Sequence, residues 1–299
     1  MPERMHSTYI TLLFCVQEKL DPMNPIAQKV TADILKAIAS DQLVLPTMPE
    51  MAIKVREVAE DPNASIKKLC DVISNDAALT ARIIKVANSP LFRAPREIED
   101  LNMALSRLGM QTTSNLATGL AMSQMFQATS DIIDQRMREV WSKSSEIAGI
   151  CHVLCKHFTK LRPDQAALAG LVHQIGILPV LSYAEDHPTL MKDSITLDSV
   201  VAQAHPAIGV RILTAWEFPS ELRKIPEQHL DYTRQVPSAD YADLVTVAMF
   251  QSHAGSSRFN NVDMESVTAF QRLGLDPNID AAEAEDLSAD MEAAMKMLQ

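Results

Sequence analysis

The stretch Ala169-Gly170-Leu171-Val172-His173-Gln174-Ile175-Gly176 places one histidine in an otherwise apolar run. A run of this kind predicts a buried helical segment that carries His173 inside the protein. A histidine followed directly by an aspartate can share a metal ion, because imidazole nitrogen and carboxylate oxygen are both good ligands. Residue 174 is a glutamine, whose neutral amide is a much weaker ligand. The stretch therefore predicts a helix with an incomplete metal-binding pair.

Helical periodicity continues through the rest of the chain. Apolar residues recur at every fourth position from 26 to 38, on one helical stripe. Ser65, Asn75 or Asp76, and Gly109 stand where helix caps are expected. With only eight glycines and no useful alternation of apolar and polar residues, strands are not expected. We predict helices over 25–39, 49–60, 65–73, 76–88, 101–108, 116–126, 131–157, around 173, from 198, from 206, over 241–253 and over 264–273.

These helices predict an all-α protein built as a two-lobed helical bundle, with an N-terminal helical lobe and a second helical lobe. We expect an N-terminal extension at 1–23, a first lobe at 24–128, a second lobe at 129–260, and C-terminal helices with an acidic tail at 261–299. A solvated acidic helix is the simplest expectation for the tail, although its thin apolar stripe could dock on the body or on a partner.

The charge is acidic throughout. The chain carries a net charge of −11, and its last 24 residues hold seven acidic side chains and one lysine. The rest of the chain stays acidic and has no stripe of lysine and arginine, so direct binding to a nucleic acid backbone is disfavoured.

The composition also predicts the compartment. The four cysteines do not have the spacing of a disulfide framework, which favours a reducing, cytoplasmic environment. The apolar run from Tyr9 to Val16 is too short to span a membrane, and no cleavage site follows it. We therefore expect no membrane association, while the sequence leaves open whether residues 1–22 belong to the native protein.

Motifs of common catalytic sites are missing from the sequence, which has no Walker loop, dinucleotide fingerprint or Gly-x-Ser-x-Gly elbow. Cys151 and Cys155 share a helix face, but His152 and His157 point elsewhere around the same helix. Two packed thiols are therefore favoured over a zinc site, which stays an alternative.

Several motifs together resemble the HDOD family, the output-type relatives of the HD phosphohydrolases. The resemblance extends roughly from Gln42 to Gly255 and implies the helical fold of that family. Its motifs are Leu45-Pro46-Thr47-Met48-Pro49, the Asp76 to Ser89 helix, Ala104 to Gly109, Ala169 to Gly176, His205-Pro206-Ala207-Ile208-Gly209, and Trp216-Glu217-Phe218-Pro219.

The resemblance allows the metal-ligand positions of active HD enzymes to be compared one by one. A ligating histidine of those enzymes corresponds here to Lys143, whose positive charge repels a metal ion. The aspartate of the HD pair corresponds to Gln174, and a later aspartate to Met249, whose thioether suits hydrolase metals poorly. Of the four ligand positions only His173 is retained. One imidazole cannot hold a divalent ion that needs three or more protein ligands.

Two further histidines belong to the motifs of the resemblance. His205 precedes Pro206, and His229 stands where the family has a pair of histidines. We expect both to be pocket residues. Lys143 could stand where a metal would place its positive charge. No catalytic residue, metal or cofactor is expected.

The resemblance implies a regulatory role in bacterial signal transduction without catalysis, with other signalling proteins or a small ligand such as a nucleotide as partners. The alternative is a phosphohydrolase or phosphodiesterase with a rebuilt or metal-free active site that uses Lys143 and His173. Regulation by direct DNA binding is disfavoured by the acidic body.

Overall fold

The computed structural model is all-helical wherever it describes the chain, and no strand occurs in these parts. This confirms the predicted all-α class. The predictions for residues 1–23 and for most of the acidic tail lie outside the described residues. The described residues are 25–40, 42–89, 92, 96–253, 259, 262–277 and 290–291.

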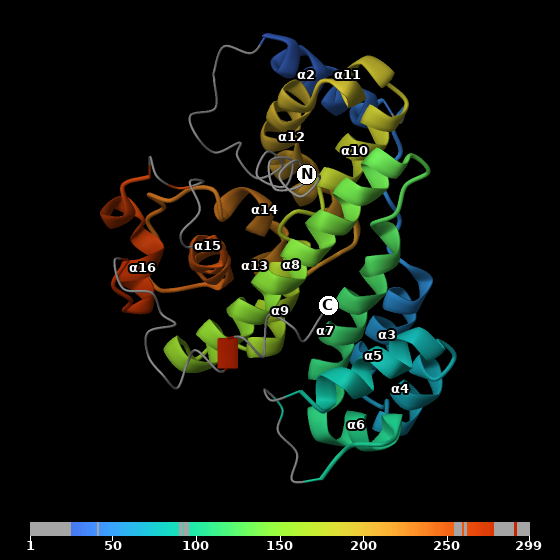
Figure 1. Ribbon diagram of the computed structural model, residues 1–299. Helices are drawn as coiled ribbons and strands as arrows, with labels where there is room; N and C mark the ends of the chain where they lie inside the picture. Colours follow the sequence, from blue (N-terminus) through green and yellow to red (C-terminus); the bar gives the residue numbers. More distant parts are fainter. Residues whose placement is uncertain are drawn as a thin grey trace, which may run out of the picture.

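One group of helices lies toward one end of the molecule (Figure 1). Each of three helices begins at a side chain that accepts a hydrogen bond from the first turn: Ser65, Asp76 and Asp100. Such caps satisfy backbone N–H groups that have no partner within the helix. The predicted caps at Ser65 and Asp76 are therefore confirmed. The group comprises α3 (Glu50–Glu60), α4 (Ile66–Ile73), α5 (Ala77–Ala87), α6 (Leu101–Leu108) and α7 (Met110–Ala121).

The start of α7 differs from the prediction. The helix begins at Met110 and not near Leu116, because Gly109 both ends α6 and precedes α7. Gly109 has a φ of 81°, a left-handed value that glycine adopts without steric strain. One residue is therefore enough to turn the chain from one helix into the next. A short 3-10 helix, η1 (Met122–Met125), follows α7.

The second group of helices is built around α8, which begins at Asp131 as predicted and ends at Phe158. Helices α10, α11, α13 and α14 were not predicted, and the C-terminal helix predicted over 264–273 is divided at Val267 by an extended residue. The group comprises α8 (Asp131–Phe158), α9 (Pro163–Val172), α10 (Ile177–Glu185), α11 (Pro188–Lys192), α12 (Ser194–Ala215), α13 (Ser220–Arg223), α14 (Ile225–Gln228), α15 (Tyr241–Ser252), η3 (Met264–Ser266) and α16 (Thr268–Leu273).

Helix α9 lies at the centre of the protein, packed against α8 and α15 of its own group and against α7 of the other. A Cβ atom on Gly170 would lie 2.5 Å from the Cα of Ala148, so the backbones of α8 and α9 touch directly. On the other side, a Cβ on Gly119 would lie 2.3 Å from the Leu171 side chain. Small residues thus allow α9 to be buried on both sides.

Helix α12 corrects a prediction. Two shorter helices were expected, beginning near Asp198 and Pro206, but one continuous helix runs from Ser194 to Ala215 with Pro206 inside it. Proline removes a backbone hydrogen bond and costs a helix interior about 3 kcal/mol. Residues on both sides of Pro206 are buried, including Val201, Ala204 and Ile208. Tertiary packing outweighs the local preference at this position.

Helix α2 (Pro25–Ala39) packs along α12, at the end of the molecule opposite to α3–α7 (Figure 1). Its helical span agrees with the prediction, but its buried face is rotated. Ile26 is 60% exposed, whereas Ala27, Ile34 and Ile38 are buried. The stripe at every fourth position therefore marks the buried face only in the second half of the helix.

The two groups of helices are also joined at the end of α12. The Arg56 guanidinium on α3 donates to the carbonyl oxygens of Trp216 (2.7 Å) and Glu217 (3.2 Å). The Trp216 indole donates to the Pro46 carbonyl oxygen at 3.0 Å. These bonds satisfy carbonyl groups at a helix end that have no partner within the helix. We call these four residues the clasp.

The described residues include one helical stretch that is long and apolar enough to cross a membrane, residues 163–185. It comprises α9 and α10, and 89% of its most apolar window is buried inside the protein. Its apolar character is therefore accounted for by its place in the core.

The close contact at Gly170 leads to a stability prediction. Gly170→Ala should lower the free energy of unfolding by about 1–3 kcal/mol, because the added methyl group collides with the Ala148 backbone. Alanine has a higher helix propensity than glycine by about 1 kcal/mol. A loss of stability in the variant would therefore result from the collision with Ala148 and not from helix propensity. Urea denaturation measures the change. Ser182→Ala, on the exposed surface of α10, is the control, and equal effects of the two substitutions would contradict the contact.

Candidate functional site

Three buried histidines lie together in the second group of helices. His173 follows α9, His205 lies within α12, and His229 follows α14. The ring centroids of His173 and His229 are 5.1 Å apart, and those of His205 and His229 are 6.3 Å apart. The structure therefore brings together three of the residues selected from the sequence. We call these residues the histidine cluster.

Backbone carbonyl groups orient two of the three rings. His173 Nδ1 lies 2.6 Å from the Gly170 oxygen, and His229 Nδ1 lies 2.7 Å from the Ile225 oxygen. A carbonyl oxygen can only accept, so both Nδ1 atoms carry the proton and donate. In the neutral ring the Nε2 atom then presents a lone pair. Both rings are held with the acceptor nitrogen directed away from the helix end.

The backbone around His205 is packed unusually closely. A Cβ atom on Gly176 would lie 2.0 Å from the His205 carbonyl oxygen and 2.5 Å from the Gly209 nitrogen. Only glycine permits the turn after His173 to approach α12 so closely. This contact holds the turn that carries His173 close to the part of α12 that carries His205.

Lys143 is held by an ion pair at the edge of this region. Its Nζ donates to Glu146 Oε2 at 2.9 Å and to the Ser252 carbonyl oxygen at 3.2 Å. The Ser252 hydroxyl donates to the other oxygen of Glu146 at 2.8 Å. The ammonium group thus joins α8 to the end of α15, where a positive charge is favourable near the carbonyl groups. Its charge is compensated by a carboxylate of the same helix.

Gln174 and Met249 are both buried. Within the described residues, Gln174 Oε1 has no hydrogen-bond partner, and neither does the hydroxyl of buried Ser144 on α8. Among the described residues no group of three or more His, Cys, Asp or Glu side chains could hold a metal ion. An amide, a thioether and a paired ammonium group therefore do not fit the metal centre that the resemblance to HD enzymes implies.

A buried ion pair that the sequence did not indicate joins the beginnings of α8 and α12. Arg136 Nη1 donates to Asp198 Oδ1 at 2.7 Å, and both side chains are largely buried. The second oxygen, Asp198 Oδ2, has no partner within the described residues. Burial raises the pKa of the Asp198 carboxyl, although Arg136 acts in the opposite direction. Neither residue belongs to a recognisable motif, so only the tertiary contact reveals the pair.

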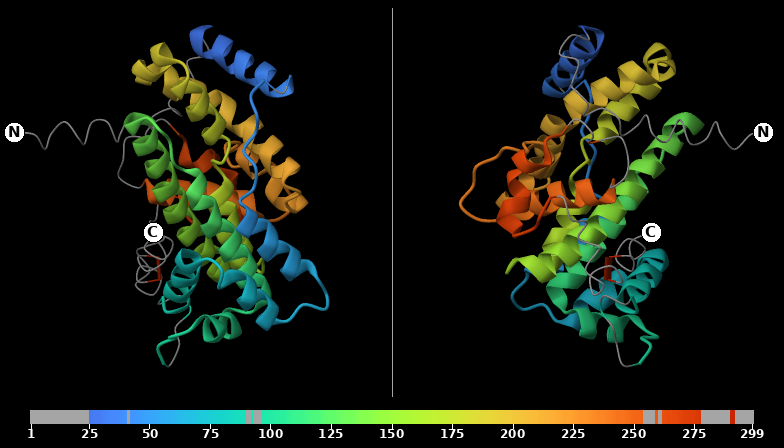
Figure 2. Two further views of the ribbon diagram at one scale, coloured as in Figure 1. Left: turned by 90° about the vertical axis from the view of Figure 1, so that its right-hand side faces the viewer. Right: turned by 60° about the vertical axis from the view of Figure 1, so that its left-hand side comes forward.

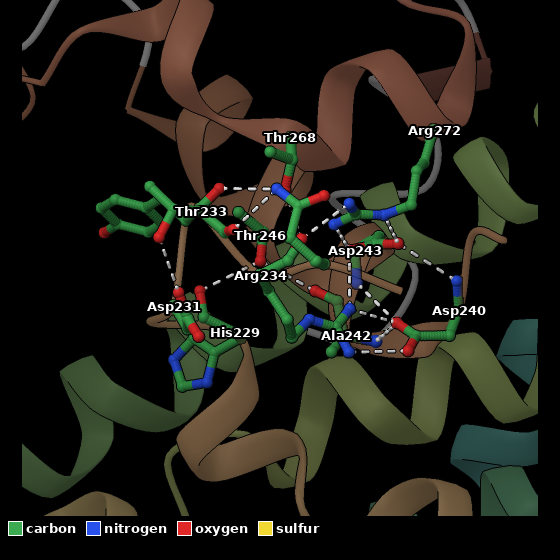
Figure 3. A network of polar contacts seen from close by, with 12 residues as sticks. His229, Asp231, Thr233, Arg234, Asp240, Ala242, Asp243, Thr246, Thr268 and Arg272 are labelled. Atoms are coloured by element: carbon green, nitrogen blue, oxygen red, sulfur yellow. Dashed lines mark hydrogen bonds and ion pairs between the residues drawn. The ribbon is translucent and has the colours of Figure 1, made fainter. Parts of the chain in front are cut away.

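A second buried network surrounds Asp243, at the start of α15 (Figure 3). Arg234 and Arg272 both donate to its carboxylate, at 2.6–2.8 Å. Asp240 caps the helix and forms two further bonds with Arg234. Burial opposes the charged forms, yet the mutual bonds lower the pKa of Asp240 and raise that of Arg234. The Asp-x-x-Asp spacing is a capping-box signal that could have been recognised in the sequence.

This network supports the histidine cluster. Thr246, one turn after Asp243 on α15, donates from its hydroxyl to the His229 carbonyl oxygen at 3.0 Å. The Thr268 hydroxyl and the Arg272 guanidinium both donate to the Arg234 carbonyl oxygen, at 2.8 Å. The segment that leads from His229 to α15 is therefore anchored at its beginning and at Arg234 (Figure 3).

Cys151 and Cys155 are buried free thiols on α8, and burial raises the pKa of both. The neighbouring histidines lie in different surroundings, as their positions around the helix predict. His152 packs edge to face against Phe92 at 5.4 Å, and His157 Nε2 lies 3.6 Å from Asp290 of the acidic tail. Two packed thiols therefore account for this segment, and Asp290 is one tail residue that lies on the body.

Residues 45–232 match the HDOD domain. The chain belongs to the HDOD domain family. The resemblance recognised in the sequence motifs is thereby confirmed, over most of the range from which it was recognised.

Solved structures similar to this HDOD chain carry different names. One is a protein from Shewanella amazonensis SB2B, whose name proposes a metal-dependent phosphohydrolase. It is 32% identical to this chain, with a TM-score of 0.82, and the match covers 92% of this chain and 99% of the Shewanella protein. An HDOD domain protein of unknown function from Geobacter sulfurreducens is 20% identical to this chain, with a TM-score of 0.64. The match covers 91% of this chain and 99% of the Geobacter protein. The latter likeness shows the fold alone.

A curated relative is an uncharacterized protein from Treponema pallidum (strain Nichols), 22% identical over 245 residues. The match includes 77% of the HDOD chain but only 45% of the Treponema protein. The HDOD chain therefore spans less than half the length of this relative.

The Asp243 network leads to a second stability prediction. Asp243→Asn should destabilise this HDOD protein by about 3–5 kcal/mol, because it leaves two buried arginines without their shared carboxylate. Arg138→Gln is the control: its exposed pair with Asp134 should contribute less than about 1 kcal/mol. Thermal and urea unfolding measure both. A loss at Asp243 no larger than that at Arg138 would contradict the role of the network.

His152 leads to a pH prediction. Burial, followed by the charge of Lys156, lowers the pKa of His152 from 6.5 to about 4, while Asp164 and Asp290 act in the opposite direction. The folded protein keeps the ring neutral, whereas the unfolded chain binds a proton below pH about 6.5. Stability should therefore fall as the pH falls from about 6.5 to 4, by up to about 3 kcal/mol from this group.

Urea unfolding at pH 7 and pH 4.5 tests this contribution. His152→Leu should reduce the difference in unfolding free energy between the two pH values, since leucine does not titrate. His187→Asn, which replaces an exposed histidine, should leave the difference close to that of the native protein. An unchanged pH dependence in His152→Leu would show that the His152 ring does not control it.

Proposed function

We propose that this HDOD protein is a non-catalytic regulatory module of bacterial signal transduction, which acts in the cytoplasm by binding other proteins or a small ligand such as a nucleotide. The main support is the state of Lys143. A side chain at a metal-ligand position of HD enzymes is here an ammonium group, paired with Glu146 and bound to the end of α15. A metal at this position would have to displace an ion pair and overcome a like charge.

The other two altered positions support the same proposal. Gln174 offers a neutral amide and Met249 a soft thioether, neither of which is a ligand of choice for the metals of hydrolases. The histidine cluster and Gln174 are buried polar side chains, the kind of group that orients a small ligand in a binding site. The acidic composition favours protein partners over direct binding to nucleic acid.

A second candidate is a phosphoester hydrolase with a metal-free site. The observation in its favour is that His173 and His229 lie together in the protein interior, since histidine is the most frequent general base. The proposed phosphohydrolase name belongs to the Shewanella protein, which is similar to this chain over nearly its whole length. The engagement of Lys143 by Glu146 disfavours this candidate, because the ammonium group would have to leave its partner to contact a phosphate.

The test combines metal analysis with a turnover assay. The native protein and His173→Ala are purified from cells grown with added manganese and iron, and their metal content is measured by mass spectrometry. Both are assayed with bis(p-nitrophenyl) phosphate and cyclic dinucleotides. We expect substoichiometric metal and equal background hydrolysis for the two proteins.

Two results would overturn the proposal. Stoichiometric manganese or iron, together with hydrolysis that His173→Ala abolishes, would establish a metal enzyme. Hydrolysis without metal that is lost in Lys143→Ala but retained in Lys160→Ala, an exposed lysine nearby in the sequence, would establish the second candidate.

A further inference from the structure

The beginnings of α8 and α12 lie at the same end of the molecule, next to the end of α10 and to α11 (Figure 2). Direct contacts hold these elements together. The Ser130 backbone N–H donates to the Glu185 carboxylate, and its hydroxyl lies 3.6 Å from the Met191 sulfur. Arg136 of α8 binds Asp198 of α12 at 2.7 Å. We call the exposed residues of 131–139 and 185–198 the helix-start surface.

Two isoleucines of the helix-start surface are exposed to solvent, Ile132 by 54% and Ile195 by 70%. Ile132 precedes Arg136 by one helical turn, and Ile195 precedes Asp198 by nearly one turn. Since Arg136 and Asp198 meet and both helices run away from this end, the two isoleucines lie on the same outer side of the ion pair. A single exposed isoleucine is ordinary on a protein surface, but two at the same end of the molecule give a partner apolar area to cover.

The helix-start surface is also strongly acidic. Residues 131–139 and 185–198 hold seven acidic and three basic side chains. Some of the acidic residues have a structural role, since Asp193 caps α12 and Asp131 lies in the first turn of α8. Arg138 and Arg136 neutralise Asp134 and Asp198. The remaining charge is negative, so a partner for this surface has to be basic.

An independent observation also points to a basic partner. Asp198 is 3% exposed, and its Oδ2 atom has no hydrogen-bond partner within the described residues. A buried carboxylate oxygen without a donor is unfavourable by about 1–3 kcal/mol. The atom belongs to the ion pair beside the two exposed isoleucines. The atom is enclosed by the protein, so a donor from a partner reaches the Asp198 carboxylate only by displacing its present neighbours, Arg136 among them.

We propose that the helix-start surface binds a basic amphipathic segment of a partner protein. Apolar side chains of the segment cover Ile132 and Ile195, and a lysine or arginine of the segment competes with Arg136 for the Asp198 carboxylate. The inference deepens the proposed regulatory function by naming a partner class. Its test measures peptide binding, whereas the test of the proposed function measures metal content and turnover. The failure of one proposal can therefore be told apart from the failure of the other.

The position of Asp198 connects this surface to the histidine cluster. His205 lies seven residues after Asp198 on α12, which places both on nearly the same helix face, about 10 Å apart along the axis. A partner that competes with Arg136 for Asp198 changes the ion pair that joins the beginnings of α8 and α12. The effect reaches His205 because both residues belong to one continuous helix.

The probe for the test is a labelled 18-residue peptide of lysine and leucine with the leucines on one helix face. Two controls have the same length: a scrambled peptide of identical composition, which has no apolar face, and a peptide with glutamate in place of lysine. Binding is measured by fluorescence anisotropy. The contact site is mapped by NMR on protein with labelled isoleucine methyl groups. We expect the methyl signals of Ile132 and Ile195 to shift with the amphipathic basic peptide, while that of Ile53, an exposed isoleucine on α3, stays unchanged.

The affinity of protein variants for the amphipathic basic peptide tests the proposal quantitatively. Ile132→Ser combined with Ile195→Ser should weaken binding at least tenfold, whereas Ile53→Ser should leave the affinity within a factor of two. Both alter exposed side chains, and thermal unfolding checks that the fold is retained. Asp198→Asn should weaken binding and reduce its dependence on salt. Equal binding of the scrambled or acidic peptide, methyl shifts elsewhere on the protein, or unchanged affinity of the double variant would overturn the proposal.

Discussion

The direct contact between the backbones of α8 and α9 at Ala148 and Gly170 is the constraint on which the rest of the structure depends. Because no side chain separates the two helices here, α9 can lie in the centre of the protein, with α7 on its other side. The turn that follows α9 then carries His173 into the interior and brings Gly176 against α12. The spacing of the histidine cluster is thus set by two close approaches, each of which requires glycine.

Charge compensation gives the interior its chemical character. Lys143, Arg136 and the two arginines around Asp243 each contact a carboxylate. Buried ion pairs contribute little net stability, because desolvation offsets much of their attraction, but they require a particular arrangement of the elements that carry them. In this protein the Arg136 pair joins α8 to α12 and the Arg272 pair joins α16 to α15, whereas Lys143 pairs within α8 and reaches α15 through the Ser252 carbonyl oxygen.

Helix α12 connects features that lie far apart on the protein. Its beginning forms part of the helix-start surface, its middle carries His205, and its end is held by the clasp to α3 of the other group of helices. Because a helix transmits displacement along its axis, an event at one of these places can alter the others. The proposed regulatory function requires such an element, since its response would consist of a change in what the protein binds.

The sequence alone determined the local features. Periodicity and caps predicted most of the helices, including the bounds of 25–39 and 101–108, and motifs from Leu45 to Pro219 identified the family. These signals were readable because they depend on neighbouring residues. The same local reasoning wrongly ended a helix at Pro206, missed α10 and α11, and turned α2 toward the wrong face at Ile26. At these positions burial against distant helices outweighs the intrinsic preference of the chain. Tertiary structure alone decided that His173, His205 and His229 come together, that Lys143 contacts the Ser252 carbonyl oxygen, and that Arg136 meets Asp198. Contacts between residues far apart in the sequence follow from how helices pack, which no pattern within a single helix specifies.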